Sequence, residues 1–236
     1  MPKYGMVIDL DRCIACQACT IACKFENNLR EGECWHTLIT IHNGGSYPSP
    51  TVEMIPRPCY HCEKAPCVKV CPTGASYKAA DGRVLIDYQK CIGCKYCMVA
   101  CPYGARVTTD RKPTAGVPSY EDAFGAVPKF GNPDLSVESN KKGLLLINAW
   151  NPKPKGLVSK CNFCAHRAEQ AKREGKTFGN PDGVITTACN EACPTEARYF
   201  GDLSDPNSYV SKLLASRPHT RIKENLGTGP QVYYLK

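Results

Sequence analysis

The sequence lacks any long hydrophobic run. Its most apolar stretch, Leu144 to Ile147 followed by Ala149 and Trp150, is far shorter than the roughly 20 apolar residues that cross a bilayer as a helix. We therefore expect no direct membrane span. The first cysteine, Cys13, is reached without a charged leader, an apolar signal-peptide segment or a pair of arginines. We expect that any export of the chain depends on another protein.

The motifs of common enzyme sites are also missing. No G-x-G-x-x-G dinucleotide fingerprint occurs. Gly175-Lys176-Thr177 resembles the end of a phosphate-binding loop, but Gln170 stands where that loop requires a glycine. No serine or cysteine lies in a recognisable nucleophile turn. The sequence therefore predicts a protein that is not an enzyme by itself.

Cysteine is the residue in excess, with 17 in 236 residues. The composition, 42% hydrophobic and 22% charged, indicates a globular chain with room for one large or two modest domains. The 19 glycines and 19 prolines predict that much of the chain is turn and loop.

Sixteen of the cysteines form four quartets. The first and third have the spacing C-x2-C-x2-C-x3-C, the second C-x2-C-x4-C-x3-C, and the fourth C-x2-C and C-x3-C separated by 24 residues. Three closely spaced cysteines can ligate three corners of an iron–sulfur cubane while the fourth thiolate reaches another cluster, so the quartets work in pairs and predict four [4Fe–4S] clusters. In order, the quartets are Cys13, Cys16, Cys19 and Cys23; Cys59, Cys62, Cys67 and Cys71; Cys91, Cys94, Cys97 and Cys101; and Cys161, Cys164, Cys189 and Cys193.

Two other roles for the cysteines fit less well. Zinc favours two cysteine pairs well separated in sequence, which only the fourth quartet offers. A disulfide framework is typical of short secreted domains, whereas this chain is long and shows no signal peptide. Because thiolates fill every corner of such a cubane, the predicted chemistry is one-electron transfer.

The net charge of +8 at first suggests a nucleic-acid partner. A cubane held by four thiolates carries a charge of about −2, so four clusters would bring the loaded chain close to neutrality. We therefore interpret the basic balance as compensation for cofactors and expect no nucleic acid.

Short strands and helices are expected beside the quartets. Strand patterns cover 4–10, 35–42, 84–87, 105–108 and 197–200, and residues 75–87 predict a hairpin with Asp81-Gly82 in its turn. Helices are expected over 17–25, 95–100 and 165–172. The sequences Cys-Pro-Thr-Gly-Ala at 71–75, Cys-Pro-Tyr-Gly-Ala at 101–105 and Cys-Pro-Thr-Glu-Ala at 193–197 indicate duplicated modules.

These patterns predict an α+β fold of tandem duplicated, bacterial-type ferredoxin modules, each with two [4Fe–4S] clusters, and long loop insertions. The insertions are residues 31–50 and 110–156, and within the second only 143–150 shows a periodic pattern. We expect the second insertion to pack over the modules or reach a partner. Residues 204–236 are expected to form a C-terminal tail that ends in a strand and drapes over another subunit.

Other residues near the quartets have more than one possible role. Cys34, outside every quartet, is interpreted as a small buried or free residue. His61 and His166 are candidates for a hydrogen bond to a sulfur or a contact with a partner. Four cations either raise cluster reduction potentials or are solvated surface charges; they are Lys24, Lys69, Lys95 and Arg167. Four aromatic rings are expected to pack against the clusters: Tyr60, Tyr96, Tyr103 and Phe163.

The four spacings occur with further local motifs: Cys-Tyr-His-Cys at 59–62, Val-Cys-Pro-Thr-Gly-Ala at 70–75, Cys-Ile-Gly-Cys-Lys-Tyr-Cys at 91–97 and Cys-Asn-Phe-Cys-Ala-His-Arg at 161–167. Together they resemble the four-cluster electron-transfer subunit of molybdopterin oxidoreductases of the dimethyl sulfoxide, polysulfide, tetrathionate and arsenate reductase type. The resemblance covers nearly the whole chain.

The resemblance implies which cysteines share a cluster. Quartets one and four would form the first module, residues 1–30 and 157–203, and quartets two and three the second, residues 51–109. Cys94 stands where some nitrate reductases have tryptophan, so no [3Fe–4S] centre is expected. The implied sets are Cys13, Cys16, Cys19 and Cys193; Cys161, Cys164, Cys189 and Cys23; Cys59, Cys62, Cys67 and Cys101; and Cys91, Cys94, Cys97 and Cys71.

The resemblance also implies partners. The chain would relay electrons between a membrane quinol- or quinone-linked anchor subunit, near the Cys91 cluster, and a molybdopterin subunit with molybdenum or tungsten, near the Cys13 cluster. The complex would reduce a sulfur compound, tetrathionate or arsenate. It would attach to the outer face of the membrane through its partners after co-export, with the cytoplasmic face as the alternative. The alternative function is a soluble polyferredoxin subunit of a hydrogenase, carbon monoxide dehydrogenase or formate dehydrogenase.

Overall fold

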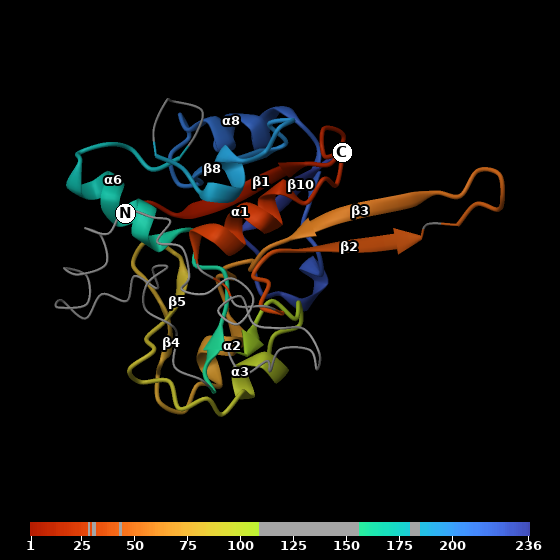
Figure 1. The fold of residues 1–236 in the computed structure, drawn as a ribbon. Helices are drawn as coiled ribbons and strands as arrows, with labels where there is room; N and C mark the ends of the chain where they lie inside the picture. Colours follow the sequence, from red (N-terminus) through yellow and green to blue (C-terminus); the bar gives the residue numbers. More distant parts are fainter. Residues whose placement is uncertain (28, 30–31, 43, 109–155, 180–184) are drawn as a thin grey trace, which may run out of the picture.

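A computed structural model describes residues 1–27, 29, 32–42, 44–108, 156–179 and 185–236 (Figure 1). Within these residues no helix has the length and apolarity needed to cross a membrane. The expected pattern at 143–150 and almost all of the second insertion lie outside the described residues. In chain order the elements are β1 (Tyr4–Asp9), α1 (Ala18–Glu26), β2 (Thr37–His42), β3 (Val52–Arg57), α2 (Pro66–Lys69), β4 (Ser76–Lys78), β5 (Val84–Ile86), α3 (Tyr96–Val99), β6 (Val107–Thr108), β7 (Val158–Ser159), α6 (Ala165–Arg173), α7 (Ala188–Glu191), β8 (Arg198–Asp202), α8 (Tyr209–Ser216), β9 (His219–Thr220), η1 (Glu224–Leu226) and β10 (Val232–Leu235).

The largest sheet has the strand order β8–β1–β10–β9. β1 runs antiparallel to β8 and parallel to β10, with Met6 opposite Val232. The C-terminal segment ends in a strand, as expected. That strand pairs within its own chain, because β10 satisfies the hydrogen-bonding edge of β1. Within residues 204–236, β9 and β10 therefore belong to the central sheet of the chain itself.

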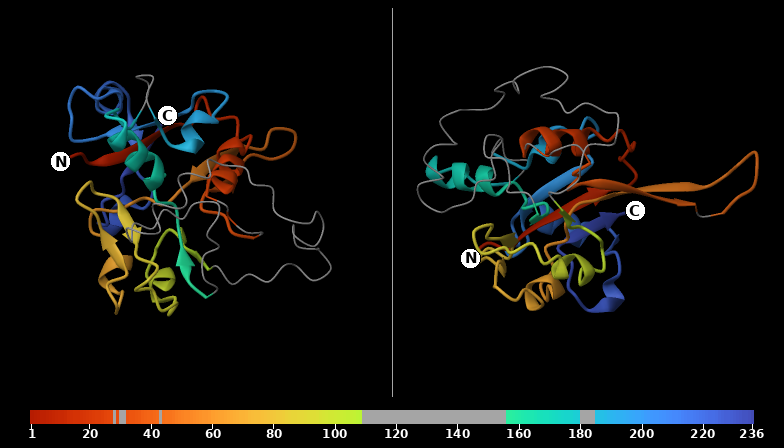
Figure 2. Two further views of the ribbon diagram at one scale, coloured as in Figure 1. Left: turned by 60° about the vertical axis from the view of Figure 1, so that its left-hand side comes forward. Right: turned by 60° about the horizontal axis from the view of Figure 1, so that its bottom comes forward.

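The two faces of this sheet bury different side chains. Successive residues of a strand point to opposite faces, so Val7 faces one side while Met6 and Ile8 face the other. On the first side, Val7 and Leu235 pack against Val210 of α8. On the second side, Met6 and Ile8 belong to the larger, cysteine-rich core. Figures 1 and 2 show α8 on one side of the sheet and α2, α3, β4 and β5 on the other.

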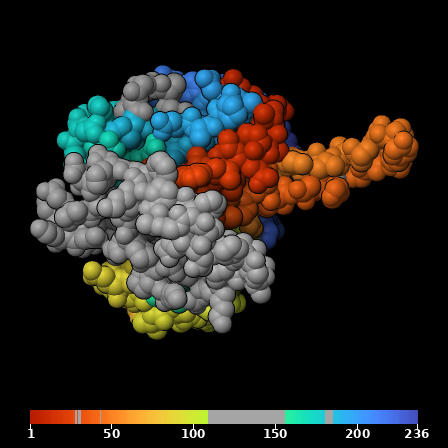
Figure 3. Space-filling view, viewed as in Figure 1, coloured from red at the N-terminus to blue at the C-terminus, as the bar shows by residue number. Residues whose placement is uncertain are grey.

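β2 and β3 form a long antiparallel hairpin, which we call the arm (residues 37–57). It projects from the body of the protein in the ribbon and the space-filling views (Figures 1 and 3). The strand expected over 35–42 begins only at Thr37, because Trp35 and His36 are buried instead as the base of the arm. The Trp35 indole donates a hydrogen bond to Ser159 Oγ at 2.9 Å. β3 comprises residues 52–57, which were expected in the second module. It pairs instead with β2 of the first insertion.

The hairpin expected over 75–87 is confirmed, with Tyr77 of β4 opposite Leu85 of β5. Gly82 takes a φ of +80° in its turn, a conformation that glycine adopts without steric cost. β6 and β7 pair antiparallel, with Val107 opposite Ser159. This pairing brings together the two points of the chain between which the second insertion lies. The expected strands before the first and third quartets and the three expected helices are also present within one or two residues of their predicted bounds.

Candidate metal centres

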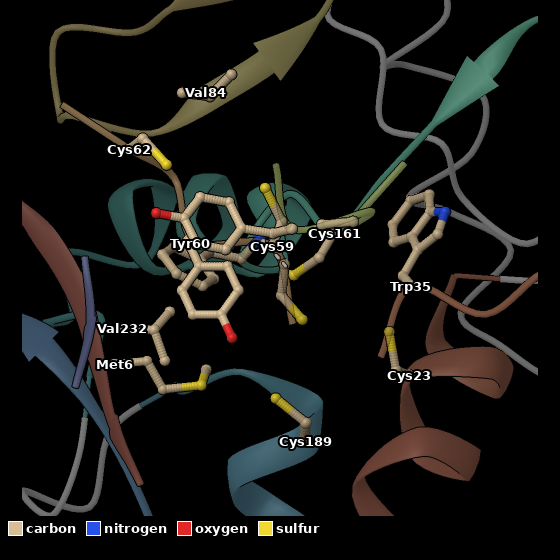
Figure 4. Close-up of a cluster of buried hydrophobic side chains, with 14 of the residues drawn as sticks. Met6, Cys23, Trp35, Cys59, Tyr60, Cys62, Val84, Cys161, Cys189 and Val232 are labelled. Carbon is tan, nitrogen blue, oxygen red and sulfur yellow. Dashed lines mark hydrogen bonds between the residues drawn. The ribbon is translucent and has the colours of Figure 1, made fainter. Parts of the chain in front are cut away.

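Four cavities in the described part of the chain are each lined by four cysteines. They are similar in size, with about 310 to 350 Å³ of space in each when the open solvent at its mouth is included. Figure 4 shows several of these sulfurs in the core, among them Cys59, Cys161 and Cys189. Cavity A is lined by Cys13, Cys16, Cys19 and Cys193, cavity B by Cys23, Cys161, Cys164 and Cys189, cavity C by Cys59, Cys62, Cys67 and Cys101, and cavity D by Cys71, Cys91, Cys94 and Cys97.

The cysteines of each cavity are the four that the resemblance assigns to one cluster. Their role as iron ligands stays a prediction. All seventeen cysteines are free of disulfides, so sixteen thiols are available as donors. Among the described residues, no three His, Cys, Asp or Glu side chains are close enough to hold a single metal ion. Cys34 lines none of the four cavities.

Left-handed backbone turns bring the first three sulfurs of a quartet together. In the first quartet Ala15 and Gln17 have φ values of 57° and 62°. In the third, Gly93 and Lys95 hold the same two positions with φ values of 70° and 62°. A non-glycine residue pays about 1 to 2 kcal/mol in this region. Such strain persists where the surrounding site requires it, and its repetition indicates that both loops have the same task.

The repeated Cys-Pro sequences share a second left-handed position. The third residue after the cysteine is Gly74, Gly104 or Glu196, with φ values of 65°, 60° and 49°. The turn aims the following backbone amides back at the sulfur: Ala197 N–H donates to Cys193 Sγ at 3.3 Å. The cysteine that ends a quartet is therefore held by a local turn, which explains why the Cys-Pro motif recurs.

Hydrogen bonds to sulfur favour the thiolate that a metal needs. Ser76 N–H donates to Cys71 Sγ at 3.4 Å, and Ala188 N–H donates to Cys164 Sγ at 3.4 Å. Burial raises the pKa of Cys71, but the hydrogen bonds from Ser76 and Thr73 outweigh burial and lower this pKa below its ordinary value.

Deep burial has the opposite effect on other thiols. It raises the pKa of Cys62 and of Cys161 to about 12, and that of Cys23 well above its ordinary value. The repulsion between neighbouring sulfurs adds to this effect. These thiols are therefore protonated at neutral pH until a metal binds, and cluster assembly releases protons.

The cavities follow one another in the order A, B, C, D. Across each boundary a pair of cysteines interacts electrostatically: Cys19 and Cys189 between A and B, Cys59 and Cys161 between B and C, and Cys67 and Cys97 between C and D. Only the end cavities have an exposed cysteine among those described, Cys16 in A and Cys94 in D. All four cysteines of B are buried.

His61 and His166, the two histidines identified as candidates in the sequence, form hydrogen bonds to groups other than sulfur. Val84 N–H donates to His61 Nδ1 at 3.0 Å, and the His61 ring stacks on Phe163 with centroids 3.8 Å apart. His61 lines C and Phe163 lines B, so this stacked pair fills the wall between the two cavities. His166 Nε2 bonds to Glu26.

A third histidine, which no sequence pattern identified, lies beside a cysteine. His36 lines B, and its Nδ1 is 3.8 Å from Cys19 Sγ of A and 3.4 Å from Thr20 Oγ1. Burial lowers the pKa of His36 well below its ordinary value, with the charge of Arg198 acting in the same direction, so the imidazole is neutral. No sequence signal set His36 apart within the strand pattern over 35–42.

The cations near the quartets divide by burial. Lys69 and Lys95 are exposed to solvent, and Arg167 is paired with Glu26, so water or a carboxylate screens these charges from the cavities. Four other cations are buried: Arg83, which pairs with Asp81, and Arg106, Lys160 and Arg198. Two of them, Arg106 and Arg198, directly follow the alanine of a Cys-Pro repeat, a position that does not by itself predict burial.

Most of the marked aromatic rings pack as expected. Tyr60, Tyr103 and Phe163 are buried, and the Tyr60 and Tyr103 rings lie 4.3 Å apart beside cavity C. Tyr96 is 58% exposed, so the expectation that it packs against a cluster was wrong. As the first residue of α3, it points outward while the next residue, Cys97, is buried.

Family models match two parts of the chain. A 4Fe-4S dicluster domain matches residues 50–116, which include the second and third quartets. A 4Fe-4S binding domain matches residues 4–25, which include the first quartet. The first of these matches contains all eight cysteines that line cavities C and D.

Several similar proteins cover almost all of the chain. A selenate reductase subunit of Mesobacillus selenatarsenatis is 41% identical, over 99% of this chain and 72% of the relative. The iron–sulfur cluster-binding subunit of the menaquinone reductase of Nitratidesulfovibrio vulgaris is 40% identical, over 99% and 88%. The iron–sulfur subunit of the arsenate respiratory reductase of a Shewanella species is 37% identical, over 99% and 96%. The chain therefore belongs to the family of [4Fe–4S] iron–sulfur subunits of molybdopterin-type oxidoreductases.

Proposed function

We propose that the chain binds four [4Fe–4S] clusters, one in each of cavities A to D, and relays electrons without a substrate site of its own. The ligands are the sixteen cysteines that line the cavities. Clusters with thiolates on every iron supply one-electron transfer. The chain itself supplies the thiolates, the amides that donate to sulfur, and a buried wall that limits the access of water.

We also propose that cavities A and B form one ferredoxin-type module and that C and D form its tandem copy. The modules comprise residues 1–30 with 157–203, and residues 51–109. Two repeated backbone conformations support the duplication. The first and third quartets each contain two left-handed residues at the same positions, and each Cys-Pro repeat contains one left-handed residue. In each module the last cysteine of one quartet lines the cavity of the other.

The linear order of the cavities is the single observation that carries the relay. Cys16 at one end and Cys94 at the other are exposed, whereas the cysteines of B are buried. Partners must come close to the terminal clusters, while the inner clusters need protection from solvent. An arrangement with two accessible ends and a buried middle is suited to passing electrons between two different proteins.

The partners that we propose are a molybdopterin catalytic subunit at cavity A and a quinone-linked membrane anchor at cavity D. The names of the selenate, arsenate and menaquinone reductase relatives support this assignment over a soluble polyferredoxin. The arm supports a large partner near A, because Leu38 and Pro56 at its base line that cavity. An isolated two-stranded hairpin is marginally stable in water, so a partner surface would stabilise it.

For the substrate and the location we propose an oxyanion or sulfur-compound reductase whose complex is attached to the membrane through its anchor subunit. The relatives named for selenate and arsenate support the oxyanion class. We further propose that the complex lies on the outer face and that the chain is exported with its catalytic partner. Protease treatment of intact spheroplasts tests this location, because a chain on the inner face would be protected.

Anaerobic purification of the full chain from its native source tests the partners. We expect one large subunit containing molybdenum or tungsten and one membrane protein to accompany it. In that complex, a menaquinol analogue should reduce the clusters, and the oxidised substrate should reoxidise them. A Cys34→Ala variant serves as control and should retain both reactions. Isolation of the chain with a hydrogenase, or with no protein that binds molybdenum or tungsten, would overturn the assignment.

A further inference from the structure

Three buried cations lie at the three boundaries between the four cavities. Arg198, Lys160 and Arg106 are only 2%, 2% and 4% exposed. Cationic side chains are rarely buried to this extent without a partner of opposite charge. Burial disfavours the charged form of all three cations, and cysteine sulfurs of the cavities act on each in the opposite direction. The net effect raises the pKa of Arg106 and of Arg198, whereas burial prevails at Lys160 and lowers its pKa below the ordinary value.

Arg106 occupies the boundary between C and D. It lines both cavities, and it interacts electrostatically with Cys67 of C and Cys97 of D. No described oxygen or nitrogen accepts a hydrogen bond from its three guanidinium nitrogens. A guanidinium buried in this way is costly unless an anion lies beside it. The sulfur groups of the two cavities are the anions available to it.

Arg198 occupies the equivalent boundary in the other module. It lines A and interacts electrostatically with Cys19 of A and Cys189 of B. Its Nη2 lies 2.9 Å from Met6 Sδ, which fixes one edge of the guanidinium against the central sheet. Arg198 and Arg106 each stand five residues after the cysteine of a Cys-Pro repeat. The duplication therefore places the same charge at the same point of both modules.

Lys160 occupies the remaining boundary, between B and C. It interacts electrostatically with Cys161 of B and with Cys59 of C. Its Nζ donates to the carbonyl oxygen of Cys161 at 2.8 Å and to that of Val84. Both acceptors are neutral, so these bonds hold the ammonium in place without cancelling its charge. The three cations thus alternate with the four cavities along the line A, B, C, D.

We propose that Arg198, Lys160 and Arg106 are shared counter-ions, each of which raises the reduction potentials of the two clusters beside it. The inference rests on the proposed function, since it requires clusters in the cavities. Reduction makes a cluster more negative, and a fixed cation in a buried, low-dielectric site stabilises the more negative state. A cation at a boundary acts on both neighbouring clusters. It therefore keeps their reduction potentials close to each other, which favours electron transfer in either direction.

The test is a redox titration of the purified holoprotein, followed by paramagnetic resonance of each cluster. Signals are assigned to cavities with Cys62→Ser for C, Cys94→Ser for D and Cys16→Ser for A. We expect Arg106→Gln to lower the midpoint potentials of the clusters in C and D and to leave those of A and B unchanged. Arg198→Gln should affect A and B instead. Arg106→Lys, which keeps the charge, should shift the potentials less than Arg106→Gln.

Lys69→Gln is the matched control, because it removes one positive charge from the surface of α2 close to the same cavities. It should leave all four potentials near their original values. The inference is overturned if fully loaded Arg106→Gln has unchanged potentials, or if Lys69→Gln shifts them equally. If Arg106→Gln fails to load iron, rescue by Arg106→Lys supports the need for charge, and failure of rescue contradicts it. A wild-type chain that binds no clusters would instead refute the proposed function.

Discussion

The carboxylate of Glu26 accepts two hydrogen bonds from the guanidinium of Arg167, at 2.6 and 2.9 Å. Glu26 ends α1, which carries Cys23, and Arg167 lies in α6, which directly follows Cys164. The pair thereby joins two walls of cavity B that are 141 residues apart in sequence. The side chains of Glu26 and Arg167 are each only about one-fifth exposed, so water screens their attraction weakly.

Replacing Glu26 with glutamine should destabilise the protein, because the substitution removes the carboxylate charge that pairs with Arg167. Burial raises the pKa of Glu26, but hydrogen bonds and charges from His166 and Arg167 outweigh burial and lower this pKa to about 2. We expect Glu26→Gln to lower the free energy of unfolding of the holoprotein by about 2 to 3 kcal/mol at pH 7. Anaerobic denaturant titration measures this difference. Glu191→Gln, which removes the more exposed partner of Arg167, should cost less than about 1 kcal/mol.

The pH dependence of this difference has a definite sign. A carboxyl whose pKa is lower in the folded state stabilises the protein above its unfolded pKa of about 4.3, and loses that effect as the pH falls toward about 2. The difference between wild type and Glu26→Gln should therefore shrink as the pH falls from about 5 toward about 2. A difference that stays constant over this fall would show that another group carries the effect.

Local patterns in the sequence predicted the parts of the fold that local forces determine. The β4–β5 hairpin followed from Asp81-Gly82 in its turn, and α1 from its place at the cysteine loop of the first quartet. The pairing of β1 with β10 joins residues more than 220 positions apart, and no local pattern contains that information. The same holds for the site. Cysteine spacing predicted the quartets, whereas the burial of Arg106 and Arg198 could not be inferred because arginine is ordinarily exposed.

Replacing Glu196 with glycine should destabilise the protein less than the same substitution at a residue with an ordinary φ. Its φ is 49°, and the two other Cys-Pro repeats have glycine at this position. Its side chain lies 4.0 Å from that of Arg12 and is 82% exposed. We expect Glu196→Gly to leave the free energy of unfolding unchanged or raise it by up to about 1 kcal/mol. Ala192→Gly, at an ordinary φ of −82°, should lower it by a similar amount. Equal losses in both variants would contradict this account.

Shortening the arm should separate assembly of the complex from cluster binding. Ile41, Val52 and Met54 are between 37% and 45% exposed, and Tyr47 is 95% exposed, so the arm offers apolar side chains to a partner. We expect that joining residues 40 and 54 through a two-residue Asn-Gly turn leaves the iron content unchanged. The same change should abolish co-purification of the catalytic subunit. Retention of that subunit at the wild-type ratio would show that the arm is not part of the interface.

Anaerobic analysis of iron and acid-labile sulfide in the natively isolated chain measures how many of the four cavities hold clusters. Four cavities, each with a cubane bound by four thiolates, predict about sixteen iron atoms and about sixteen sulfides per chain. The reduced protein should also give the paramagnetic resonance of interacting clusters. Zinc without sulfide, or an iron content near eight, would contradict the claim that all four cavities hold electron-carrying clusters.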